Sequence, residues 1–131
     1  PVMITPEERM TISATAATGT INFDLSTQGI LYYTTDASGN FTLNFRGNSG
    51  TTLNSALAIG DSVSAVFLNT NGATAYYATA FQIDGTSVTP KWVNGTAPSA
   101  GNTSSIDAYT FTIIKTASAT YTVLETQTKF A

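Results

Sequence analysis

The chain has 131 residues and a mass of 13.7 kDa, enough for one domain around one hydrophobic core. It contains no cysteine and no histidine, which excludes disulfides, thiolate nucleophiles, catalytic imidazoles and metal sites built on these ligands. A net charge of −3, with only five scattered cations, argues against the clustered basic face that nucleic-acid backbones require. No segment approaches the ~18 apolar residues of a membrane span.

Residues 1–9 are expected to form an N-terminal arm or a short helical turn, with Thr5 as its cap and Pro6 at its first position. After it, apolar residues alternate with threonine and other small polar residues. Threonine supplies 25 of the 131 residues, and its branched side chain suits the solvent face of a strand. Runs of this kind cover residues 10–17, 20–25, 29–34, 40–46, 62–69, 74–83, 86–93, 106–115 and 118–126.

Turn residues separate these runs. The segments Asp36–Asn40 and Asn69–Gly72 each join two strand-like runs, and both are predicted to be β-hairpin loops. Residues 51–59 are predicted to be a short helix or an irregular crossover, and residues 94–105 a long loop. The chain shows no clear internal repeat. Many short strands at near-regular spacing predict one all-β domain over residues 1–131. We expect an antiparallel, jelly-roll-like β-sandwich of about eight to ten strands.

Four longer runs cover most of the chain and resemble a known protein module. They are EERMTISATAATGTINFDL (7–25), YYTTDASGNFTLNFRG (32–47), AYYATAFQIDG (75–85) and TPKWVNGTAPSAGNTSSIDAYTFTIIKT (89–116). They resemble an all-β module that recurs in virion structural proteins of marine tailed bacteriophages, especially cyanophages. The resemblance implies a component of the virion: a capsid decoration, a capsid fibre or a tail element. It carries over no catalytic residues.

No pattern in the chain points to catalysis or to a cofactor. Glu7 and Glu8 are adjacent rather than paired across a cleft, so they fit the first turn of a helix better than a glycosidase site. Asp36 and Asp84 neighbour glycine, where aspartate commonly bonds local backbone amides. Calcium at either one is disfavoured because no dense acidic motif surrounds them. We therefore expect no enzyme activity, metal or cofactor.

The residues best suited to contact a partner are aromatic. Tyr32–Tyr33 and Tyr76–Tyr77 each put one ring on either face of a sheet, and we single out Tyr33 and Tyr77 together with Trp92. These rings are predicted to be partly buried core residues, anchors in a protein interface or platforms for a sugar. Arg46 ends a strand-like run, where it can clamp a partner's carboxylate or, slightly favoured, pair with a local aspartate.

Low charge removes repulsion between copies, which favours assembly through the surface. Together with the resemblance, this predicts a non-catalytic virion protein that binds itself as a homo-oligomer and binds other virion proteins. The resemblance to phage fibres and decoration proteins makes a trimer the first expectation. The alternative is a carbohydrate-binding module for host-surface glycans. Neither nucleic acid nor membrane is an expected partner.

Overall fold

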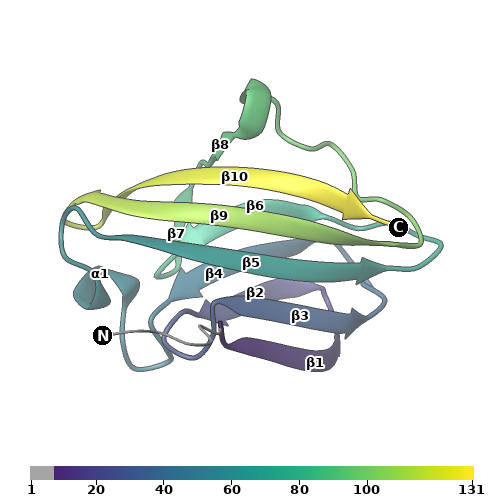
Figure 1. The fold of residues 1–131 in the computed structure, drawn as a ribbon, viewed down its shortest axis with the longest axis horizontal. Helices are drawn as coiled ribbons and strands as arrows, with labels where there is room; N and C mark the ends of the chain where they lie inside the picture. Colours follow the sequence, from purple (N-terminus) through teal and green to yellow (C-terminus); the bar gives the residue numbers. More distant parts are fainter. Residues whose placement is uncertain (1–7) are drawn as a thin grey trace, which may run out of the picture.

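The computed structural model describes residues 8–131, which form two β-sheets and one short helix (Figure 1). The six-stranded sheet has the order β1-β3-β5-β9-β10-β8, and the four-stranded sheet the order β2-β4-β6-β7. The strands are β1 (Met10–Ala16), β2 (Gly19–Asp24), β3 (Ile30–Thr35), β4 (Phe41–Arg46), β5 (Ser62–Asn71), β6 (Ala78–Ile83), β7 (Thr86–Val88), β8 (Lys91–Trp92), β9 (Ser105–Ala117) and β10 (Thr120–Phe130). The all-β class is therefore confirmed.

The first six strands wind as a coil between the two sheets. Each odd-numbered strand joins the six-stranded sheet and the next strand joins the four-stranded one, so that β1, β3 and β5 pair in parallel and so do β2, β4 and β6. Five of the eight strand pairs are parallel, and the sheets are mixed rather than antiparallel. The sequence contains no clear repeat, yet this two-strand turn recurs three times, because backbone pairing needs no repeated side chains.

The two predicted hairpins are wrong for the same reason. The Asp36–Asn40 turn does not return the chain to the same sheet but carries it across to the other one. The Ala37 amide donates to the Thr70 carbonyl, and the Ser38 amide to the Ala17 carbonyl, so the turn is bonded to the neighbouring crossings. Ala17 and Ala37 are both buried, which places small side chains at these corners. After β5, the chain crosses again before β6 begins.

One aromatic core lies between the sheets. The alternation predicted from the sequence holds, because Phe23 and Phe45 face inward from β2 and β4 and are fully buried. Phe45 meets Phe111 of the opposite sheet, with ring centroids 4.7 Å apart and nearly edge to face. Phe41 packs in the same way against Tyr109, at 5.9 Å. These contacts fix the two sheets face to face.

Three local expectations can be compared with the structure. The helix predicted within residues 51–59 is present as α1 (Leu53–Ala56), with Thr52 as its N-cap. The long loop after Trp92 is also present, and it opens with a 3₁₀ turn, η1 (Val93–Gly95). The helical turn expected near the N-terminus falls mostly on residues 1–7, outside the described residues, and Glu8 and Arg9 are not helical. No helix within residues 8–131 is long and apolar enough to cross a membrane.

Candidate functional site

The solvent side of the six-stranded sheet, here called the outer face, has a uniform composition. Strand register places its residues in rows, such as Ile12, Tyr32 and Leu68 across β1, β3 and β5, and then Ala108 on β9. The apolar members of these rows are Met10, Ile12, Ile30, Tyr32, Val66, Leu68, Ile106, Ala108, Ile114, Leu124 and Phe130. The remaining positions on the adjoining strands are mostly threonine.

The rows at the centre of the outer face carry no charge. Among residues 8–131, two charged residues lie at its borders: Lys91 beside Leu124, and Glu8, which lines a hollow with Ser64 and Val66. Ile12 is 66% exposed, Phe130 59% and Met10 41%, so apolar surface of the chain meets water here. Five strands about 4.8 Å apart give the whole face, threonines included, an area of roughly 400 Å². Nothing in this surface suits a charged ligand, but it suits another apolar protein surface.

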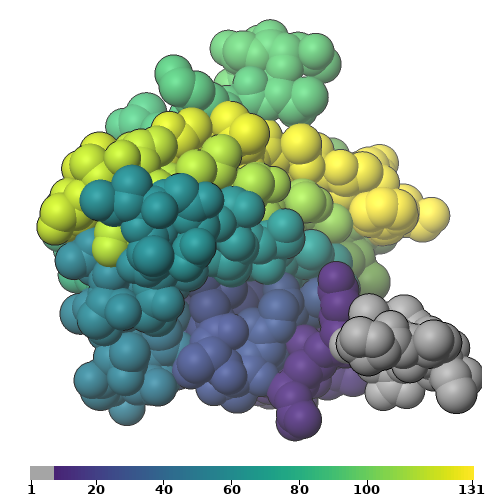
Figure 2. All heavy atoms as spheres, turned by 60° about the vertical axis from the view of Figure 1, so that its left-hand side comes forward, coloured from purple at the N-terminus to yellow at the C-terminus, as the bar shows by residue number. Residues whose placement is uncertain are grey.

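The structure brings two predicted residues, Tyr77 and Trp92, together in a groove away from the outer face. The groove has a volume of about 360 Å³ and lies between β6, β7 and the segment that follows β8. Trp92 packs edge-on against Phe81, with ring centroids 5.7 Å apart, and Pro98 closes the far wall. This wall belongs to the loop that stands away from the body of the molecule in Figures 1 and 2.

The lining of this groove mixes aromatic rings with hydroxyls. Thr79, Ser87 and Thr89 contribute their side chains beside Tyr77 and Trp92. Rings stack on the apolar face of a sugar, and hydroxyls bond its polar edge. The groove is thus the one place among the described residues where the predicted aromatic contacts converge.

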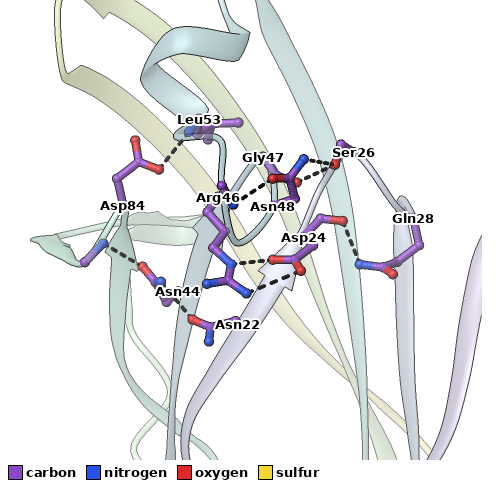
Figure 3. A network of polar contacts seen from close by, with 12 residues as sticks. Asn22, Asp24, Ser26, Gln28, Asn44, Arg46, Gly47, Asn48, Leu53 and Asp84 are labelled. Atoms are coloured by element: carbon purple, nitrogen blue, oxygen red, sulfur yellow. Dashed lines mark hydrogen bonds and ion pairs between the residues drawn. The ribbon is translucent and has the colours of Figure 1, made fainter.

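Arg46 lies in a different region, where it pairs with a neighbour on the adjacent strand (Figure 3). Its Nε donates to Asp24 Oδ1 at 2.5 Å and its Nη2 to Asp24 Oδ2 at 3.4 Å. The two residues are register partners on β4 and β2. The hydrogen bond to Asp24 raises the pKa of Arg46 above its ordinary value. Of the two roles considered from the sequence, the structure shows the local pair.

Polar side chains around this pair bond to one another and to the backbone. Asn44 donates to Asn22 Oδ1 at 3.0 Å and accepts from the Gly85 amide at 2.9 Å. The Asp84 carboxylate accepts from the Leu53 and Asn54 amides, at 2.7 and 3.0 Å, and so caps α1 (Figure 3). The hollow beside them, about 410 Å³, is lined by groups already engaged in structure. This cluster holds the end of the sheet in place.

In the Tyr32–Tyr33 pair, the ring on the outer face is not Tyr33, the one singled out from the sequence. Tyr33 faces inward and packs edge-on against Phe67, with centroids 5.3 Å apart, and its partial burial raises its pKa. Its neighbour Tyr32 lies on the outer face instead. The sequence predicts that the two rings lie on opposite faces of the sheet. Which ring faces the core depends on the strands that flank β3, and the sequence does not give these.

Glu125 is a buried acid that the sequence did not predict. It is 2% exposed, and neither carboxylate oxygen has a hydrogen-bond partner. It faces the core side of β10, with Phe111 beside it on β9 and Trp92 beside it on β8. Burial raises its pKa from 4.5 to about 9, so it is a neutral acid at pH 7.

Within residues 8–131 the side chains form no cluster suited to hold a metal ion. No group of three or more acidic side chains lies together in the part of the chain that the structure describes. Searches of protein-family models, of curated proteins and of solved structures each find no match to this chain.

Proposed function

We propose that this chain is a non-catalytic structural protein that works by self-association, as a component of a bacteriophage virion. In this proposal the two packed sheets act as a sandwich-like, jelly-roll-like rigid unit. The observation that carries the self-association is the apolar outer face, which has charged residues at its borders only. The virion assignment is supported by the sequence resemblance and is compatible with a molecule that acts through its surface.

The outer face supports self-association because two copies can meet there without burying unpaired charges. Two such faces bring only aliphatic, aromatic and threonine side chains together, so no buried charge is left without a partner. Association removes apolar area from water at about 25 cal/mol per Å². The same face on both partners gives an interface that closes on itself by two-fold symmetry.

A matched pair of isoleucines tests this proposal. Ile12 and Ile59 are 66% and 65% exposed, but only Ile12 lies on the outer face, while Ile59 lies in the loop before β5. We expect Ile12→Glu to weaken self-association at least tenfold, because it buries two like charges, and Ile59→Glu to leave it unchanged. Light scattering coupled to gel filtration measures the mass of each variant. Equal behaviour of the two variants would contradict the proposal.

The same masses address the predicted trimer, which stays a prediction. A two-fold outer-face contact produces a dimer, whereas a trimer requires a heterologous contact that closes after three copies. A mass of three chains would therefore place the contact elsewhere.

The virion assignment has its own test, in quantitative mass spectrometry of purified particles of the phage that encodes the chain. We expect many copies per particle if it belongs to the capsid or tube lattice, and a few dozen or fewer if it belongs to a tail or fibre. Complete absence from the particles would overturn the assignment and leave the self-association to be explained otherwise.

A second candidate function is recognition of host-surface glycans in the groove of Tyr77 and Trp92. The convergence of both rings on one groove favours it. Trp92 is the only tryptophan of the chain, so its fluorescence reports on the groove directly. Titration with a glycan panel that changes this fluorescence would support the candidate, and loss of the change in Tyr77→Ala would confirm the site. A panel without any effect would exclude it.

A further inference from the structure

The two sheets end differently at their two sides. At one side the edge strands are β7, with three residues, and β8, with two. Pro90 lies between them in the chain. Short strands, proline and the charge of Lys91 are the usual means of preventing another strand from adding. At the other side the edge strands are β1 and β2, with seven and six residues. They contain no proline and no lysine, and their one charged residue, Asp24, pairs with Arg46.

Among residues 8–131, both long edge strands have backbone groups at this side that no other described strand pairs with. The Arg9 carbonyl accepts bonds from the start of β3, so along β1 every second residue points to β3 and the others, Met10 and Ile12, point away. The Leu25 amide donates to the Arg46 carbonyl, so by the same alternation the amides of Thr20 and Asn22 on β2 point away from β4. Each sheet therefore offers a row of free donors and acceptors.

We propose that this side binds a second copy of the chain, β1 against β1 and β2 against β2, in antiparallel pairs. A single two-fold axis perpendicular to the sheets serves both pairs, because β1 and β2 lie at the same side of two facing sheets (Figure 1). Each sheet then runs on into the sheet of the partner. The contact is made by backbone hydrogen bonds rather than by the apolar side chains of the outer face.

A second copy is the occupant that the chemistry favours. β1 consists of uncharged residues, and the charge at the end of β2 is already neutralised, so like edges meet without repulsion. The opposite, blocked side cannot receive these edges, so copies close as a pair rather than extend head to tail. The edge of β1 is continuous with the outer face, because Met10 and Ile12 belong to both. Two separate two-fold contacts on one chain allow assemblies larger than a dimer.

Amide hydrogen exchange followed by NMR over a range of protein concentrations tests the edge contact. We expect the Thr20 and Asn22 amides to exchange at least tenfold more slowly at high concentration, because they become bonded to the partner. The Ile21 amide, which points to β4, is protected throughout and serves as the internal reference. Since β2 does not belong to the outer face, its amides report on the edge alone.

Two exposed threonines of the same sheet provide the matched variants, Thr20→Lys on β2 and Thr86→Lys on β7. Thr20→Lys should abolish the slow exchange at Asn22, and Thr86→Lys should preserve it. If the mass rises with concentration but the β2 amides stay fast, the edge contact is overturned and the outer-face proposal stands. A chain that stays monomeric overturns both.

Discussion

Replacing Glu125 by glutamine is expected to raise the free energy of unfolding at pH 7 by about 3 kcal/mol. The carboxyl group is buried without a partner between Phe111 and Trp92, and its pKa in the folded protein is about 9 against 4.5 for the ordinary group. At pH 7 the folded protein must hold a proton that the unfolded chain releases. Glutamine keeps the shape of the neutral acid and removes this cost.

The sign of the pH dependence follows from the raised pKa of Glu125. Below pH 4.5 both states hold the proton, and the contribution to stability is complete. Between pH 4.5 and about 9 the unfolded state is ionised while the folded state is not, so stability falls by about 1.4 kcal/mol per pH unit. This slope should be absent in Glu125→Gln.

Urea unfolding of both proteins across this pH range measures the effect. Glu8, which is exposed, provides the control, since Glu8→Gln should retain the slope of the wild type. If the free energy of unfolding of the wild type changes by less than ~1 kcal/mol from pH 5 to pH 8, Glu125 has a charged partner or water in solution.

The second large effect is expected at Phe111, where the two sheets meet. Its ring is fully buried and contacts Phe45 at 4.7 Å and Phe81 at 5.9 Å, both from the opposite sheet. Phe111→Ala removes these contacts and leaves a cavity that the paired strands cannot close. We expect a loss of about 4 kcal/mol in the free energy of unfolding.

Phe130→Ala is the matched control, because this ring is 59% exposed at the end of β10. It should change stability by less than about 0.5 kcal/mol when measured at low protein concentration. Denaturant unfolding followed by circular dichroism gives both values. A loss at Phe111 no larger than that at Phe130 would mean that the sheets do not pack as described.

The strands could be predicted from the sequence, but their pairing could not. Alternation is a local signal, so Ile21 and Phe23 identify a strand and its inner face without any knowledge of its neighbours. Whether a turn reverses a chain within one sheet or carries it to another depends on contacts far away. The Ala37 amide donates a hydrogen bond to the Thr70 carbonyl, and no pattern within residues 36–40 predicts this contact.

The same limit explains the candidate sites. The sequence singles out Tyr77 as one ring of a tyrosine pair and Trp92 as an aromatic residue at the edge of the long loop, and the fold places both on one groove. The outer face was not predicted, because its rows combine residues from strands up to about a hundred positions apart, such as Ile12 and Ala108. The signal that could have found it is the lack of charge on the outward positions of β1, β3 and β5. Glu125 gave no signal, since one acid within a strand usually faces water.

The most direct test of the account is sedimentation velocity of the wild-type chain over a wide range of concentrations. The apolar outer face predicts that the sedimentation coefficient rises with concentration as copies associate, and that added salt does not weaken the association. A single species of 13.7 kDa at every concentration would contradict the central claim, that the protein works by binding copies of itself.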